Sequence, residues 1–187
     1  RVEHRHEDRG QGDRHKARER RVRVEMIQTG ARDVLYDQSF RVRSGGRLVV
    51  DLGSENVVVR TGSGDRARVV VEGRGRDDEE EFQRRRFTAR TQGDRLVVRT
   101  DPPNRRWSMS SRDAQYQVTV EIPRRFSADL DLGSGNVEIA ALEGDLSVDV
   151  GSGNVSVASV VGSATIDTGS GNVQVGDVSG DLEVDRR

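Results

Sequence analysis

Three aspartates recur at a fixed spacing, each beside a glycine-rich corner that could hold a metal ion. Asp131, Asp149 and Asp167 stand eighteen residues apart, and Gly-Ser-Gly-Asn-Val follows each of them after one residue. Carboxylate and amide oxygens suit calcium, and calcium-binding β-rolls also use two nine-residue units per coil. Here, however, the acid recurs only once in two such units, and Asn replaces Asp after the second glycine. We therefore keep the three aspartates as candidate metal ligands and the calcium-binding β-roll as an alternative, but expect no bound metal.

Other reactive side chains lack the partners that catalysis needs. No serine has glycine two residues away on both sides, so the nucleophile elbow of hydrolases is absent. The only lysine, Lys16, follows no phosphate-binding glycine loop. All three histidines, His4, His6 and His15, fall in one charged segment, and the chain contains no Cys. The sequence therefore predicts a protein that is not an enzyme and uses no cofactor.

The aspartates belong to an eighteen-residue unit that is written three times between residues 131 and 185. A glycine recurs every nine residues, and apolar residues alternate with polar ones after it, as in a strand with one buried face. A period this short predicts a solenoid. We expect an all-β chain forming a parallel β-solenoid (β-helix) with eighteen-residue coils and two short strands in each coil. An antiparallel meander of nine-residue arms is the alternative.

The repeated Gly-Ser-Gly-Asn segments are expected to form the corners of the coils. Glycine adopts positive φ at little cost, and each Asp is expected to accept N–H bonds from its own corner. The asparagines should hydrogen-bond from coil to coil, as in an internal asparagine ladder. The expected corner residues are Gly133, Gly135, Asn136, Gly151, Gly153, Asn154, Gly169, Gly171 and Asn172.

Charge and composition divide the chain into three parts. Residues 1–33 form a charged arm with very little apolar surface, so we expect it to be disordered. Residues 34–126 are interpreted as irregular β-structure continuous with the solenoid, and residues 127–187 as its regular repeats. The last part carries 11 acidic and 2 basic residues, against 21 acidic and 29 basic residues before it. The repeats are therefore an acidic module attached to a basic one.

The middle part contains an imperfect fourth copy of the corner, Asp51-Leu-Gly-Ser-Glu-Asn-Val. The solenoid is therefore expected to begin there and to be interrupted. Residues 77–86 are a candidate helix or a charged loop, with Phe82 and Phe87 as anchors to the sheet. Trp107, the only Trp, lies in a basic loop. It is expected either to contact a sugar or a base at the surface or to cover an open end of the sheet.

The ends and the composition of the chain lead to four further expectations. Arg1 rather than Met opens the sequence, so we expect a trimmed chain from which any secretion signal has been removed. No transmembrane segment is expected, because no stretch is apolar enough. Asp185 stands where a further corner would start, so the last coil should leave an open edge that favours end-to-end self-association. We expect no nucleic-acid partner, since acids interrupt the basic arm.

The order of strands and turns resembles a known family. A Gly-Gly-x-Leu-x-Val-Asp strand at residues 45–51 precedes Thr-Gly-Ser-Gly-Asp at 61–65, Val-x-Val-x-Ile-Pro at 118–123 and the Gly-Ser-Gly-Asn-Val repeats. Over about residues 37–185 the chain resembles the bacterial "putative adhesin" domain family of unknown function. The resemblance implies a β-helix-like domain of exported or cell-envelope proteins, at the cell surface or in the periplasm, without catalytic residues.

These observations together predict a non-enzymatic, exported β-solenoid. We expect it to act as an adhesion or assembly surface for a protein or a polysaccharide whose identity the sequence leaves open. The alternative is an envelope scaffold or stress-sensing module that binds another protein edge to edge.

Overall fold

The computed structural model describes residues 32–73, 82–101 and 116–187, which form fourteen strands. The prediction of an all-β chain is confirmed. The strands are β1 (Asp33–Arg41), β2 (Arg47–Leu52), β3 (Asn56–Gly62), β4 (Arg66–Gly73), β5 (Phe87–Gln92), β6 (Arg95–Thr100), β7 (Gln117–Pro123), β8 (Ser127–Ser134), β9 (Val137–Ile139), β10 (Leu146–Ser152), β11 (Val155–Val160), β12 (Ala164–Ser170), β13 (Val173–Val178) and β14 (Leu182–Arg186).

Several features predicted from the sequence lie wholly or partly outside the residues that the structure describes. The three histidines, Trp107 and most of the charged arm lie outside the described residues, and so do residues 77–81 of the candidate helix. Residues 82–84, at the end of that candidate, are helical. β1 begins at Asp33, the last residue assigned to the arm. Within the described ranges, no helix is long and apolar enough to cross a membrane.

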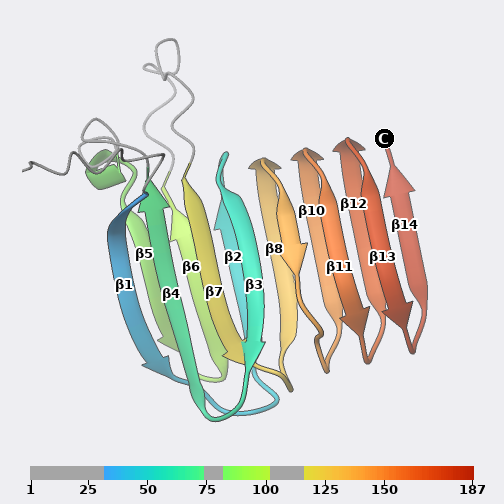
Figure 1. Cartoon of the computed structure of the whole chain (residues 1–187), viewed down its shortest axis with the longest axis horizontal. Helices are drawn as coiled ribbons and strands as arrows, with labels where there is room; N and C mark the ends of the chain where they lie inside the picture. The colour runs from blue at the N-terminus through green and yellow to red at the C-terminus, as the bar shows by residue number, and fades with distance from the viewer. Residues whose placement is uncertain (1–31, 74–81, 102–115) are drawn as a thin grey trace, which may run out of the picture.

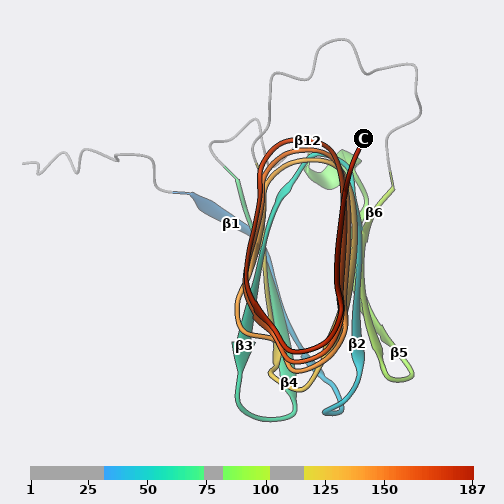
Figure 2. The same cartoon turned by 90° about the vertical axis from the view of Figure 1, so that its right-hand side faces the viewer.

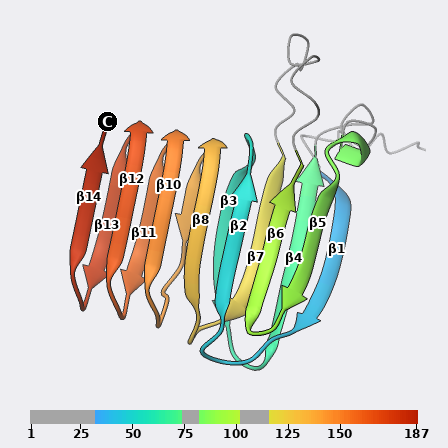
Figure 3. The ribbon, with the colours of Figure 1, turned by 180° about the vertical axis from the view of Figure 1, so that it is seen from behind.

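The strands form two seven-stranded sheets that face each other. Sheet A has the order β1-β4-β7-β3-β9-β11-β13, and sheet B has the order β14-β12-β10-β8-β2-β6-β5. Figure 1 shows sheet A in front, and Figure 3 shows sheet B from the opposite side. In the repeats the neighbouring strands of each sheet are all parallel. The antiparallel meander therefore does not occur there.

Identical positions of successive repeats lie side by side. Asp149 pairs with Asp131 on one side and with Asp167 on the other, and Asp167 pairs with Asp185. Val155 is paired in the same way between Val137 and Val173. This register places each apolar side chain on its equivalent in the next strand, which buries the apolar face and satisfies the backbone N–H and C=O groups.

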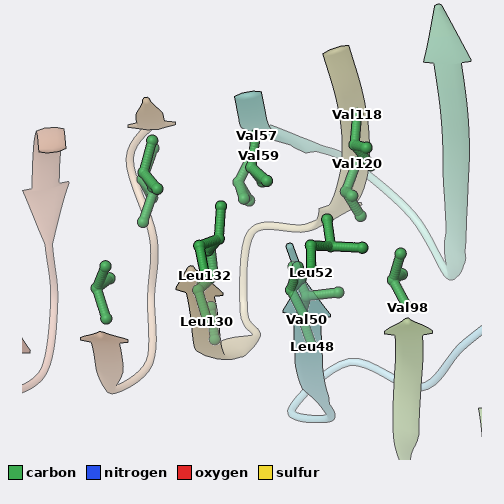
Figure 4. Packing of buried hydrophobic residues seen from close by; sticks show 14 of the residues in the cluster. Leu48, Val50, Leu52, Val57, Val59, Val98, Val118, Val120, Leu130 and Leu132 are labelled. Carbon is green, nitrogen blue, oxygen red and sulfur yellow. The ribbon is translucent and has the colours of Figure 1, made fainter. Parts of the chain in front are cut away.

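A narrow apolar core fills the space between the two sheets. Seen along the stack, the chain forms two long walls joined by short corners (Figure 2). Valines and leucines from both walls point toward one another (Figure 4), and the labelled ones are buried: Leu48, Val50, Leu52, Val57, Val59, Val98, Val118, Val120, Leu130 and Leu132. The low hydrophobic content is sufficient because each strand contributes only two or three side chains to this single layer.

The order of strands in space differs from their order in the chain. β2 lies between β6 and β8, and β3 lies between β7 and β9, although β4 to β7 follow β3 in sequence. β4 pairs antiparallel with β1 and β7, and β5 pairs antiparallel with β6. Asp51 is in register with Asp131, and Leu52 with Leu132. The hypothesis that the repeat pattern begins at Asp51 and is interrupted is therefore confirmed.

The two ends of the stack differ. An aromatic cluster closes the end formed by β1 and β5: ring centroids are 5.0 Å apart for Tyr36 and Phe87, 5.4 Å for Phe82 and Phe87, and 5.9 Å for Phe82 and Tyr116. The predicted anchoring role of Phe82 and Phe87 is consistent with these contacts. The opposite end, formed by β13 and β14, leaves Leu182 49% and Val184 39% exposed. Among the described residues, β13 and β14 each have one edge without a neighbouring strand, and end-to-end association stays a prediction.

Candidate functional site

The corners are built from glycines that no other residue could replace without displacing the backbone. Gly153 has φ 146°, and a Cβ atom on it would lie 1.9 Å from the carbonyl oxygen of Gly135. Gly151 has no left-handed backbone, but its Cβ atom would lie 2.5 Å from the oxygen of Gly133. The first glycine of the corner is therefore required by close stacking, and the second by stacking and backbone conformation together.

A ladder of asparagines runs along these corners. The Asn136 backbone N–H and side-chain Nδ2 both donate to Oδ1 of Asn56, at 2.9 and 3.2 Å. Asn154 makes the same two bonds to Asn136, at 3.1 and 3.0 Å, and the Asn172 backbone N–H donates to Asn154 Oδ1 at 3.0 Å. The predicted coil-to-coil bonding is confirmed. The expectation of an internal ladder is wrong, because Asn136, Asn154 and Asn172 are exposed.

The asparagine ladder borders a shallow groove of about 390 Å³ on the outer face of sheet A. An amide NH₂ group has two hydrogens, and the bond to the preceding asparagine uses only one in Asn136 and Asn154. The groove therefore combines amide donors with the carboxylate of Glu138 and the hydroxyl of Ser156. Its lining residues are Asn56, Val57, Val58, Gln117, Asn136, Val137, Glu138, Asn154 and Ser156.

Aspartates form a second ladder, on the outer face of sheet B. Asp51 extends the series of Asp131, Asp149, Asp167 and Asp185 to five paired positions. Arginines bind near both ends: Arg99 forms an ion pair with Asp51 at 2.8 Å, and Arg187 forms one with Asp167. Arg187 thus contacts the ladder.

The middle of the aspartate ladder is electrostatically unfavourable. Within the described residues, the side chains of Asp131 and Asp149 accept no hydrogen bond, so the predicted bonds from their own corners do not form. The backbone N–H groups of the corners bond to the neighbouring coil instead. Partial burial, followed by the charges of Asp149, Asp51 and Asp129, raises the pKa of Asp131 above its ordinary value. The ladder therefore favours a protonated or screened state of the Asp131 carboxylate.

Sodium chloride should raise the melting temperature of the protein. At the strand spacing of about 5 Å, neighbouring carboxylates repel by about 1 kcal/mol in water and about 3 kcal/mol at an effective dielectric near 20, and salt screens this repulsion. Calcium at matched ionic strength should add little, because the corner asparagines supply no second charge. Thermal melts in the two salts test this expectation. Strong stabilisation by millimolar calcium alone would instead make Asp131, Asp149 and Asp167 metal ligands.

Replacement of Asp131 by Asn should stabilise the protein at neutral pH by about 1–2 kcal/mol, because it relieves the repulsion from two paired neighbours, Asp51 and Asp149. Because the pKa of Asp131 is raised in the folded protein, the folded state binds its proton more tightly than the unfolded chain does. The wild type therefore gains stability as pH falls through this raised pKa, and the gain is complete below the ordinary carboxyl pKa of about 4. The advantage of the variant in unfolding free energy should shrink over that interval. An advantage that stays constant with pH would contradict this account.

The described residues offer no enclosed set of metal ligands. Among residues 32–73, 82–101 and 116–187, no three His, Asp or Glu side chains form a group that could hold a metal ion. The aspartates lie in a row across neighbouring strands, one on each strand, and such a row presents carboxylates one after another instead of surrounding an ion.

One buried ion pair was not predicted from the sequence. Glu55 occupies the corner position that glycine occupies in the repeats, and its carboxylate pairs with Arg85 at 2.9 Å while accepting the Ser54 backbone N–H at 2.8 Å. The Arg85 guanidinium lies 5.0 Å from the centre of the Tyr116 ring. The only signal in the sequence is the change from Gly-Ser-Gly-Asn to Gly-Ser-Glu-Asn. This pair fixes the aromatic end of the stack to the first corner.

Several solved structures of bacterial proteins are similar to this chain at low sequence identity. A "putative cell adhesion protein" from Clostridium sporogenes is 10% identical, with 83% of this chain and 100% of that chain covered and a TM-score of 0.45. A "putative adhesin" from Bacteroides fragilis is 11% identical, with 84% and 99% covered and a TM-score of 0.36. A "putative lipid binding protein" from Parabacteroides distasonis is 11% identical, with 81% and 96% covered and a TM-score of 0.33.

No curated protein matches the sequence. One family model does, over residues 46–184, and its description is Toastrack DUF4097. The match includes the first imperfect corner, the inserted strands and nearly all of the repeats. The resemblance to a domain family of unknown function is thereby confirmed, and this chain belongs to the DUF4097 (Toastrack) family.

Proposed function

We propose that this protein is a non-enzymatic, exported β-solenoid with eighteen-residue coils, which works as an adhesion or assembly surface. The observation that carries the proposal is the repetition of one polar side chain along an outer corner. Asn56, Asn136, Asn154 and Asn172 are linked in series, so the same donor recurs at every strand spacing. A surface with this periodicity suits an extended partner with a repeating structure.

The groove beside the asparagine ladder favours a polysaccharide as that partner. Sugar hydroxyls both donate and accept hydrogen bonds, and the groove presents amide N–H donors beside a carboxylate acceptor. The groove crosses strands β3, β9 and β11, so it runs along the stack, the direction in which a long bound chain would extend. Val58 supplies an apolar contact for the ring faces of a sugar.

A polysaccharide pull-down with two matched variants tests the proposal. Ser156→Arg places a long side chain in the groove, and Ser147→Arg places the same side chain on the outer face of sheet B. Both serines are exposed and lie on neighbouring strands of the chain, β11 and β10. We expect Ser156→Arg to abolish retention on the polysaccharide that the wild type binds, and Ser147→Arg to leave it unchanged. Equal retention of both variants would contradict a role for the groove.

The open end supports the second candidate function, a scaffold or stress-sensing module that binds a protein edge to edge. Leu182 and Val184 are exposed there, and β13 and β14 each have one edge without a neighbouring strand among the described residues. Such edges accept a further strand from another chain. Light scattering across a wide concentration range would detect end-to-end self-association. Loss of that association in Leu182→Glu would assign it to this end, and a monomer throughout would rule it out.

A further inference from the structure

Four turns meet at the ends of the strands that lie at the bottom of Figure 1. They connect β1 to β2, β3 to β4, β5 to β6 and β7 to β8, at residues 42–46, 63–65, 93–94 and 124–126. The first turn and the start of β2 are bonded through the backbone to each of the others: Val42 N–H to Asp65 O at 2.9 Å, Gly45 N–H to Arg125 O at 2.6 Å, and Arg47 N–H to Asp94 O at 3.0 Å. The turns after β1 and after β3 extend beyond the corners of the repeats on this side (Figure 2). The four turns are therefore one connected, protruding part of the molecule.

Exposed arginines surround these turns. We call six of them the basic tip: Arg41, Arg43, Arg47, Arg66, Arg95 and Arg125. Among the residues that the structure describes, none of the six makes an ion pair, whereas Arg68, Arg85 and Arg99 do. The turns contain only two acids, Asp65 and Asp94. The basic tip therefore carries an excess of positive charge.

The basic tip extends over both walls of the stack. Its paired members are in register on the outer faces of the two sheets, Arg41 with Arg66 on sheet A and Arg47 with Arg95 on sheet B. The other two lie in the turns that cross from one sheet to the other. Neighbouring strands are about 4.8 Å apart and facing sheets about 10 Å apart, so the charges are spread over an area and not along a single row.

A hollow of about 400 Å³ opens among the turns. It is lined by Arg41, Val42, Arg43, Asp65, Gly93 and Asp94. Guanidinium groups bind phosphate oxygens well, and carboxylates accept hydrogen bonds from hydroxyl groups. The turn glycines leave room for a ligand, since no atom lies within 4 Å of a Cβ atom added to Gly45, Gly64 or Gly93. The hollow therefore suits a small group that combines a phosphate with hydroxyls.

We propose that the basic tip binds a membrane surface containing anionic phospholipids, with the strands standing close to the membrane normal. A headgroup layer is about 5–7 Å thick, so the turns can enter it while the long arginine side chains of both walls reach its phosphates. Each arginine near such a surface strengthens binding about fivefold. This contact is additional to the proposed adhesion surface, because the asparagine ladder lies at the opposite ends of the strands and would face away from the membrane.

The shape of the tip favours a lipid surface over a linear polyanion. A linear chain needs a row of positive groups, but the corners that continue from the tip along the stack carry Glu143, Asp145 and Asp181, which would repel it. A headgroup layer instead surrounds a protruding tip and contacts both walls at once. The same three acids should keep the open end of the stack farther from the membrane than the aromatic end.

Co-sedimentation with vesicles measures this interaction. We expect the wild type to bind vesicles of phosphatidylglycerol and phosphatidylcholine in equal parts, and not vesicles of phosphatidylcholine alone. Within the described residues, no large exposed apolar side chain belongs to the basic tip, so binding should depend on charge. An increase from about 20 to about 300 mM sodium chloride should weaken it at least about tenfold.

Two double variants locate the contact. Arg43→Gln/Arg125→Gln removes two charges from the basic tip and should weaken vesicle binding at least about tenfold. Arg86→Gln/Arg186→Gln makes the same change in net charge on exposed residues at the opposite ends of β5 and β14, and should bind as the wild type does. Circular dichroism of each variant separates lost binding from lost fold.

A single fluorescent label tests the orientation, because the chain contains no Cys. Ser63→Cys places the label in the turn between β3 and β4, and Ser152→Cys places it on a corner at the opposite ends of the strands. Both serines are exposed. On anionic vesicles the label at residue 63 should become shielded from acrylamide, a quencher in the water, and the label at residue 152 should stay accessible.

Four results would overturn the proposal. They are a wild type that does not prefer anionic vesicles at about 20 mM sodium chloride, full binding by Arg43→Gln/Arg125→Gln, shielding at residue 152 instead of residue 63, and binding to a soluble anionic polysaccharide without binding to vesicles. The last result would assign the arginines to a polyanion. Because Arg43→Gln/Arg125→Gln leaves the groove residues unchanged, lost vesicle binding with intact retention on a polysaccharide separates this contact from the proposed function.

Discussion

Replacement of Val155 by Asp unfolds the coils around β11 and lowers the unfolding free energy by at least about 4 kcal/mol. Val155 is 1% exposed and is paired between Val137 and Val173, so its methyl groups contact equivalent residues on both sides. A carboxylate in that position would be buried in a single apolar layer without a partner. Because each coil is stabilised mainly by its neighbours, the loss should extend to β13 and β14.

Ser156→Asp is the matched control for this change. Ser156 follows Val155 in the same strand, but its side chain points outward and is exposed. The same carboxylate should therefore cost little there. Thermal and urea unfolding, with the β-sheet signal as the readout, would measure both variants. If the Val155→Asp protein had the same melting temperature as the Ser156→Asp control, the result would contradict a core shared between coils.

Replacement of Gly153 by Ala should cost about 3–5 kcal/mol, from two separate causes. The φ of 146° is unfavourable for any residue with a Cβ atom. In addition, the new atom would lie 1.9 Å from the carbonyl oxygen of Gly135, so two stacked corners would have to move apart. That movement would break the bond from the Gly153 N–H to Ser170 or the bonds of the adjacent asparagine ladder.

Two other glycines separate these causes. Gly64 has φ 114° with nothing within 4 Å of the added Cβ atom, so Gly64→Ala should show the backbone strain alone, about 1–2 kcal/mol. Gly62 has neither a left-handed backbone nor a close neighbour, and Gly62→Ala should be nearly neutral. The expected order of destabilisation in urea unfolding is Gly153, then Gly64, then Gly62. A Gly153→Ala cost equal to that of Gly64→Ala would show that the corners are not tightly stacked.

The sequence determined the local structure of the repeats because their information is contained within eighteen residues. Alternation after each glycine defined which side chains face inward, and the burial of strands β8 to β12 follows it. The repetition also determined the register, since only one alignment places glycine on glycine and valine on valine. The corner of Asp51 could be recognised for the same reason, although it lies eighty residues before its neighbour Asp131.

Only the tertiary structure decided which parts lie beside the first corner. Nothing local indicates that β6 and β7 lie on one side of β2 and β3, because those strands lack the glycine corner that defines the repeat. Their place depends on the aromatic cluster and on the pair of Glu55 with Arg85, which are contacts between distant segments. Sequence periodicity cannot reveal such contacts, since it describes only how a segment resembles its own copies.

The structure also decided where the polar ladders face and how charge is distributed. Periodicity predicts that identical side chains stack, but not whether a corner residue points inward, and the asparagines proved to be exposed. The distribution of charge on sheet B likewise needs the folded chain, because that sheet combines the arginines of β5 and β6 with the aspartates of β8, β10, β12 and β14. Stacking follows from repetition within the sequence, whereas the composition of a face depends on which distant strands the core brings together.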